Sequence, residues 1–150
     1  MLKLGNISLD VPFYQAPLSG YTDRAMRVLA HKYGAPLTYT GVILAKIALH
    51  KKAFNRLFFQ PRADEGLVGA QILGEDPETM AKAAAAFSNV GFDLIDLNFA
   101  CPAPKVLRRY SGGYLLKDPE TAIKIIRFVR DSVSCPVTIK LRAGFDKSQE

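Results

Sequence analysis

Apolar positions along the 150-residue chain follow two alternating patterns. Short apolar runs, typical of buried strands, are separated by longer stretches in which apolar residues recur every three or four positions, as on one face of a helix. The short runs predict strands over residues 11–16, 37–42, 67–73, 92–98 and 137–141, and the longer stretches predict helices over residues 22–33, 45–57, 76–90 and 118–133. Strands that alternate with helices imply a parallel sheet covered by helices.

The two clearest helix starts share the same four residues, Asp-Pro-Glu-Thr, at positions 76–79 and 118–121. In each, the aspartate suits the N-cap, the proline suits the first helical position, and the glutamate places negative charge in the first turn. This recurrence supports a chain built from repeated strand–helix units.

Two α/β architectures fit this order, a doubly wound open sheet and a (β/α)8 barrel. The chain lacks a Gly-x-Gly-x-x-Gly after its first strand and a Gly-Lys-Ser/Thr phosphate loop, which disfavours the common nucleotide-binding open sheets. Polar residues gather on one strand face near the carboxyl ends of three strands, at Gln71, at Asp96 and Asn98, and at Thr138 and Lys140. Barrel active sites lie at those ends. We therefore predict an α/β fold of the (β/α)8 TIM-barrel type, with residues 1–150 forming its N-terminal part, about five strands and four helices.

Composition places the chain among ordinary globular proteins, with 49% hydrophobic and 23% charged residues. It has no uninterrupted apolar stretch of the ~18 residues that span a membrane and no secretory signal, so we expect no membrane association. The net charge of +6 favours a polyanionic partner such as a nucleic acid. Two cysteines are too few for a disulfide scaffold and indicate a reducing compartment, which predicts a cytoplasmic location.

Cys101 is the most informative single residue, because it stands three residues beyond a predicted strand, in a loop that can reach a barrel pocket. A thiol there can act as a nucleophile, a metal ligand or a general acid. We expect no metal site, because Cys135 is far along the chain and His31 and His50 lie in predicted helical segments. Cys135, beside Pro136 at a strand start, is expected to be inert packing.

Several segments, taken in order, resemble the tRNA-dihydrouridine synthases. They are residues 16–24 (APLSGYTDR), 71–74 (QILG), 96–106 (DLNFACPAPKV), 112–116 (GGYLL) and 136–142 (PVTIKLR). The resemblance implies a flavin-binding (β/α)8 barrel followed by a small helical domain. It also implies reduction of the C5=C6 bond of particular uridines in tRNA, with FMN as hydride carrier and NADPH or NADH as the electron source.

The resemblance also implies roles for the matching residues. Cys101 would be the general acid that delivers a proton to C5 of the uracil while reduced FMN delivers hydride to C6, which requires a protonated thiol. Lys140 would stabilise the reduced flavin near its N1–C2=O edge; an internal ion pair with Asp96 is an alternative compatible with that role. Gln71 would pair with the flavin pyrimidine edge. The segment Ala16, Pro17 and Leu18 would lie against the flavin.

The resemblance also implies residues that face the substrate. Asn98 matches a residue near the target uracil, and Arg142 would help to fix flavin or substrate. Lys105, Arg108 and Arg109 follow the cysteine and would meet tRNA phosphates, with Lys51, Lys52 and Arg56 as a second basic cluster or, equally, a solvated surface. The sequence departs from the family's usual residues at Leu18, Ala100, residues 40–42 and Tyr114, and residues 40–42 and Tyr114 put substrate choice in doubt.

Two other functions stay open at this point. One is a related FMN barrel that reduces a free pyrimidine, as dihydroorotate dehydrogenases do, and the other is a non-catalytic RNA-binding remnant. The basic residues after Cys101 favour tRNA over a free pyrimidine. We expect the full-length protein to be monomeric. Because the phosphate-holding loops of such barrels usually follow strands seven and eight, we expect residues 1–150 alone to bind FMN weakly or not at all.

Overall fold

The computed structural model describes residues 1–50 and 60–146. Its strands are β1 (Leu2–Leu4), β2 (Ile7–Leu9), β3 (Leu37–Tyr39), β4 (Ile43–Leu44), β5 (Leu67–Leu73), β6 (Leu94–Asn98) and β7 (Val137–Lys140). Its helices are α1 (Arg24–Lys32), α2 (Ala45–Ala48), α4 (Pro77–Asn89), α5 (Pro104–Leu107) and α6 (Pro119–Ser132), with 3-10 turns η2 (Ala63–Glu65) and η3 (Gly112–Leu116).

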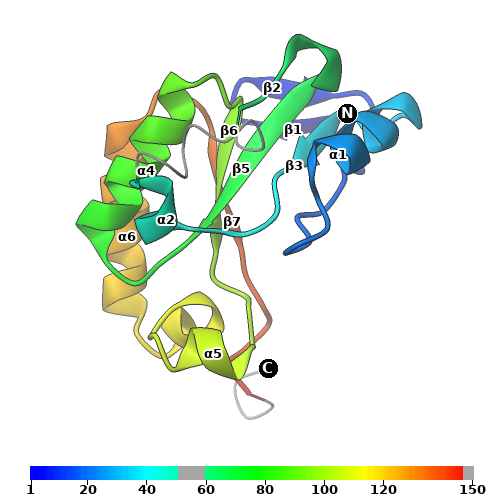
Figure 1. Cartoon of the computed structure of the whole chain (residues 1–150). Coiled ribbons are helices and arrows are strands. Elements are labelled where there is room, and N and C mark those ends of the chain that lie inside the picture. Colours follow the sequence, from blue (N-terminus) through cyan, green and yellow to red (C-terminus); the bar gives the residue numbers. More distant parts are fainter. Residues whose placement is uncertain (51–59, 147–150) are drawn as a thin grey trace.

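A parallel sheet forms the centre of the structure, with the spatial order β3–β5–β6–β7 and β4 paired to the end of β5. Helices α4 and α6 lie side by side against one face of this sheet, and the hairpin β1–β2 lies near the start of β3 (Figure 1). The predicted α/β class and parallel sheet are confirmed.

The two repeated helix starts are confirmed as N-caps. The Asp76 carboxylate accepts a hydrogen bond from the Thr79 backbone N–H at 2.8 Å, and Asp118 does the same for Thr121 at 3.1 Å. In both helices the proline occupies the first turn, where its missing N–H costs nothing. Helix α1 is capped by Asp23, whose carboxylate accepts from the Met26 N–H at 2.9 Å.

The predicted strand over residues 11–16 is wrong. This segment runs without strand structure beside β3, joined to it by a hydrogen bond from the Gln15 N–H to the Leu37 carbonyl at 3.0 Å. Pro12 and Pro17 carry no N–H for a ladder, which accounts for the break. The chain instead begins with the antiparallel hairpin β1–β2, turned at Gly5-Asn6.

Two further boundaries differ from the predictions. The predicted strand 37–42 splits, because β3 ends at Tyr39 and β4 pairs separately with the far end of β5, Ile43 opposite Ile72. Of the predicted helix 45–57, the described residues contain only the short helix α2, Ala45–Ala48. Its continuation, with the basic cluster Lys51, Lys52 and Arg56, lies outside the described residues.

The central strands β5 and β6 are buried on both faces, whereas β7 is half-buried and ends at the exposed Lys140. In β6, Ile95 and Leu97 face the core shared with α4 and α6, where Phe87 is fully buried. Leu94 belongs to a second apolar cluster with Leu37 and Tyr39, near the hairpin. Burying one such large side chain contributes ~1.5–3 kcal/mol. On β6, Leu94 of the second cluster shares a face with Asp96 and Asn98. These polar residues lie farther along the strand than the cluster does. Cys135 packs at the edge of the first core.

Candidate functional site

Polar side chains line one face of β5, β6 and β7 at their carboxyl ends. Strand register places Gln71 of β5 beside Asp96 of β6, and Asp96 beside Thr138 of β7. Two residues farther along, Asn98 stands beside Lys140. Because side chains alternate along a strand, these groups point to the same side of the sheet. The predicted clustering of polar groups at this edge is confirmed.

A continuous chain of hydrogen bonds joins these side chains. The Thr138 hydroxyl donates to Asp96 Oδ1 at 2.5 Å, and Gln71 Nε2 donates to Asp96 Oδ2 at 2.6 Å. Asn98 Nδ2 then donates to Gln71 Oε1 at 2.8 Å. Gln71 is fully buried and Asn98 is 6% exposed, so the two bonds of Gln71 form out of competition with water, whereas the bond from Thr138 is partly buried.

Asp96 sets the direction of this chain. An ionised carboxylate only accepts hydrogen bonds, so it draws the NH2 group of Gln71 toward itself and turns the Gln71 oxygen toward Asn98. Burial raises the pKa of Asp96, while the hydrogen bonds from Gln71 and Thr138 and the positive charge of Lys140 oppose that shift. The alternative ion pair between Asp96 and Lys140 does not form within the described residues.

Asn98 connects this chain of hydrogen bonds to the loop that holds Cys101. Its Oδ1 accepts the backbone N–H groups of Ala100 at 3.2 Å and of Cys101 at 3.0 Å. The Cys101 carbonyl in turn accepts the Gly113 N–H at 3.0 Å. The cysteine loop is therefore fixed from both sides, by β6 and by η3.

Gly112 permits the close approach of η3 to Cys101. Its φ is +62°, and a Cβ at this position would stand 2.7 Å from Val106 Cγ1, 3.0 Å from the Cys101 carbonyl oxygen and 3.1 Å from Cys101 Cβ. An L side chain would therefore meet both backbone strain and contact with the cysteine. The short helix α5, begun by Pro104, follows this loop and packs against η3.

Cys101 borders a cavity of about 210 Å³, which we call the Cys101 cavity. It is lined by Ser19, Val42, Leu44, Leu73, Cys101, Lys105, Val106, Arg109 and Ser111. The thiol is half-buried and is not in a disulfide. The cavity thus brings a free thiol together with apolar walls and the cations Lys105 and Arg109.

A second cavity, of about 360 Å³, surrounds Lys140 and is called the Lys140 cavity. Its lining includes Tyr14, Ala16, Pro17, Tyr39, Asp96, Thr138, Ile139 and Lys140. The rings of Tyr14 and Tyr39 lie 5.4 Å apart, and burial, with the charge of Asp96, raises the pKa of Tyr39. Apolar and aromatic walls with one exposed cation can accommodate a planar ring that carries negative charge.

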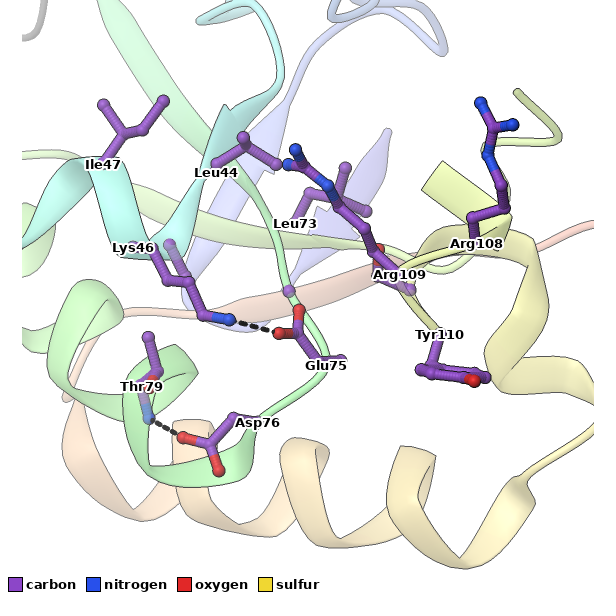
Figure 2. Close-up of a pocket in the computed structure, with 13 residues that line it drawn as sticks. Leu44, Lys46, Ile47, Leu73, Glu75, Asp76, Thr79, Arg108, Arg109 and Tyr110 are labelled. Carbon is purple, nitrogen blue, oxygen red and sulfur yellow. Dashed lines mark hydrogen bonds and ion pairs between the residues drawn. The ribbon is translucent and has the colours of Figure 1, made fainter. Parts of the chain in front are cut away.

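A third cavity, of about 630 Å³ and larger than the other two, lies next to the Cys101 cavity and is called the outer cavity (Figure 2). It is lined by Leu44, Ala45, Lys46, Ile47, Leu73, Gly74, Glu75, Asp76, Thr79, Arg108, Arg109, Tyr110 and Ser111. On one side Lys46 pairs with Glu75 at 2.5 Å. On the other side lie Arg109 and Tyr110 (Figure 2).

The structure distributes the predicted site residues among these places. Cys101 and Lys105 meet in the Cys101 cavity; Ala16, Pro17 and Lys140 meet in the Lys140 cavity; and Arg108 lines the outer cavity. Gln71 and Asn98 lie in the buried chain between the first two cavities. Leu18, 47% exposed, and Arg142, exposed beside Gly113, line none of the three.

Sequence reasoning missed roles for Thr138 and Tyr39. Thr138 shares a strand face with Lys140, and this spacing was the available signal for a polar partner of Asp96. Tyr39 is the last residue of β3. It belongs to the second apolar cluster, with Leu37 and Leu94, and it also lines the Lys140 cavity. No sequence pattern distinguishes it from an ordinary core tyrosine. None of the helices in residues 1–50 and 60–146 is both long enough and apolar enough to span a bilayer.

Comparison with known proteins gives a consistent result. The family model described as dihydrouridine synthase matches residues 14–150. The tRNA-dihydrouridine synthase B of Vibrio vulnificus is 36% identical over 145 residues, which cover 97% of this chain and 45% of that protein. The probable tRNA-dihydrouridine synthase of Rickettsia conorii is 36% identical over 148 residues, covering 97% and 44%. The corresponding protein of Rhodobacter capsulatus is 34% identical over 149 residues, covering 99% and 46%. The chain thus spans about 45% of the length of the curated relatives it matches.

Proposed function

The chain belongs to the dihydrouridine synthase family, and on that premise we propose that the protein containing it reduces the C5=C6 bond of a uridine in tRNA. The parallel sheet of the chain is then part of the family's (β/α)8 barrel. The observation that carries the proposal is Cys101, whose loop is fixed by Asn98 and Gly113 at the mouth of a cavity with two cations. Free thiols and a tRNA substrate agree with a cytoplasmic location.

The Lys140 cavity is suited to hold FMN. Ala16 and Pro17 offer backbone and apolar contact to a flat ring, and the ammonium of Lys140 offers a positive charge to its polar edge. When bound, FMN supplies the hydride that reduces C6, after NADPH or NADH has supplied the two electrons. Gln71 is fully buried and is not among the residues that line this cavity, so its proposed pairing with the flavin rests on the one N–H and one lone pair that it keeps beyond its bonds to Asp96 and Asn98.

Cys101 supplies the proton of the same reaction. Saturating C5=C6 adds hydride to C6 and a proton to C5, so the thiol gives up its proton at C5 and recovers one from water afterwards. Asn98 holds the backbone of Cys101 and its neighbour, which limits the movement of the thiol relative to the sheet. A positioned general acid of this kind contributes roughly 10²–10⁴ in rate.

Cations near Cys101 would bind the RNA backbone. Lys105 and Arg109 line the Cys101 cavity, and Arg108 lies beside it in the outer cavity. Phosphate contacts fix the register of an RNA, and the target base must leave its stack to enter a pocket. A free pyrimidine would need no such row of cations, so we favour tRNA over a free pyrimidine.

The test is reduction of tRNA by the full-length protein. Purified protein is loaded with FMN and incubated with NADPH and an unmodified tRNA transcript pool, and dihydrouridine is measured by mass spectrometry after digestion. We expect dihydrouridine in tRNA and none in free uridine or orotate incubated in parallel. Reduction of a free pyrimidine alone would favour the dihydroorotate dehydrogenase type of reaction. RNA binding without any reduction would favour a non-catalytic RNA-binding protein.

A further inference from the structure

The outer cavity and the Cys101 cavity share a wall. Leu44, Leu73, Arg109 and Ser111 line both of them, so the two spaces adjoin at the carboxyl end of β5. Figure 2 shows the Arg109 side chain reaching toward Leu44 above Leu73, along this shared wall. A ligand whose reacting part occupies the Cys101 cavity therefore has a second, larger space directly beside it.

Cations without acidic partners border this second space. Lys46 is neutralised by Glu75 at 2.5 Å. Within the described residues, the guanidinium groups of Arg108 and Arg109 form no ion pair and no hydrogen bond. Both arginines are exposed. Their charge is available to an anionic group at the boundary of the two cavities.

Tyr110 presents an aromatic ring at the same place under backbone strain. Its φ of +54° is the only positive φ of a non-glycine residue in the described parts of the chain. The residue is 62% exposed, and its ring touches Tyr114 edge to face with 5.0 Å between centroids. Such strain at an exposed aromatic residue is typical of functional positions.

We infer that the outer cavity binds the nucleotide next to the target uridine. In this arrangement, which rests on the proposed function, Arg109 contacts the phosphate that joins the two nucleotides. The neighbouring base lies between the apolar wall of Leu44 and Ile47 and the ring of Tyr110. A base drawn out of its stack leaves its neighbour without a stacking partner, and an aromatic side chain replaces that partner. The site therefore takes a dinucleotide step of single-stranded RNA.

Tyr110 gives a test in which a structural role and a binding role predict opposite changes. Glycine adopts a positive φ without strain, so Tyr110→Gly leaves the thermal unfolding midpoint of the full-length protein unchanged or raises it. The same substitution removes the ring and weakens binding of an unmodified tRNA transcript about 5- to 100-fold. Tyr110→Phe keeps the ring and binds within about twofold of wild type. Tyr33→Ala, at an exposed tyrosine outside all three cavities, serves as the control.

A second pair of variants tests the cavity from its opposite wall. Ile47→Glu places an anion in the outer cavity, while Ile123→Glu makes the same change on α6; the two isoleucines are 46% and 47% exposed. Only Ile47→Glu is expected to weaken tRNA binding, by about 10-fold or more, with the KM for NADPH unchanged.

The outcomes separate this inference from the proposed function. Wild-type affinity of Tyr110→Gly and Ile47→Glu for tRNA overturns the inference even if dihydrouridine forms. A raised KM for NADPH with unchanged tRNA affinity also overturns it and assigns the cavity to the coenzyme. Weakened tRNA binding in both variants supports the subsite even if the wild-type protein forms no dihydrouridine, in which case the proposed function alone is wrong.

Discussion

Gln71 and Asn98, on neighbouring strands, share a hydrogen bond of 2.8 Å that connects a buried carboxylate to the loop of Cys101. The bond has only one workable orientation, because Asp96 accepts from the Gln71 amide at one end and two backbone N–H groups donate to Asn98 at the other. The position of the proposed general acid thus depends on the sheet interior as well as on its own loop.

Asn98→Ala is expected to misplace Cys101 without unfolding the protein. The substitution removes the acceptor for the Ala100 and Cys101 N–H groups and leaves Gln71 Oε1 without its donor. A displacement of about 1 Å at a reacting group can cost ~10² in rate, so kcat for tRNA reduction should fall by about that factor while KM changes little. Asn89→Ala, at an exposed position ending α4, is the control. Equal kcat in both variants would contradict the positioning role of Asn98.

Asp96→Asn should alter the pH dependence of stability. Burial raises the native pKa of Asp96 above that of the unfolded chain, so the native state holds the proton more tightly between those two values. The free energy of unfolding therefore falls as pH rises through this window, at most by about 1.4 kcal/mol per pH unit. Asparagine retains an oxygen for Gln71 and does not titrate, so the fall is absent in the variant.

The measurement for Asp96 is denaturant unfolding of both proteins between about pH 4 and pH 7. Asp76 and Asp118, whose pKa values are lowered by hydrogen bonds from Thr79 and Thr121, contribute equally to both curves and cancel in the difference. The prediction is that the variant gains stability relative to wild type as pH rises. A difference that is constant with pH would show that Asp96 titrates alike in both states.

Gly112→Ala should cost more stability than the same change at Gly91. Both glycines have positive φ, +62° and +98°, but only at Gly112 would the new Cβ meet other atoms, those of Val106 and Cys101. Strain alone costs about 1–2 kcal/mol, and Gly112→Ala should exceed that loss. It should also change the rate at which iodoacetamide alkylates Cys101. Identical losses of stability at the two positions would contradict the close approach described for η3.

Lys140→Met is expected to lower the reduction potential of flavin bound to the full-length protein. In the proposed flavin site, the ammonium of Lys140 would stabilise negative charge in the cavity that it lines, and methionine keeps the length of the side chain without the charge. Lys82→Met, at a position on α4 that is 66% exposed in its side chain, is the matched control. Redox titration monitored by flavin absorbance gives both values. Equal potentials would remove Lys140 from the proposed flavin site.

The elements that sequence predicts well are those with local signals. Asp76-Pro77 and Asp118-Pro119 define helix starts by their own chemistry, and the structure has both caps. The segment 11–16 shows the opposite case, since an apolar run bounded by prolines lies along a strand without joining its ladder. The hairpin β1–β2 at the start of the polypeptide could have been predicted, because Gly5-Asn6 between two short apolar segments is typical of a two-residue turn.

The site was predictable to the level of residues on one strand face, but not to the level of their partners. Alternation placed Asp96 with Asn98 and Thr138 with Lys140. It could not show that Thr138, rather than Lys140, bonds Asp96, because that choice depends on side-chain lengths and on burial across two strands. The backbone conformation of Tyr110 could not be predicted either, because a positive φ at a tyrosine has no sequence signature.

The single-turnover reaction of full-length Cys101→Ala tests the proposed proton transfer most directly. Protein loaded with FMN is reduced with NADPH, freed of excess coenzyme and mixed with an unmodified tRNA transcript, and dihydrouridine is followed with time beside wild type. We expect the variant to retain its flavin spectrum and tRNA affinity but to form dihydrouridine about 10²–10⁴ times more slowly. Formation at the wild-type rate would contradict the assignment of Cys101 as the general acid.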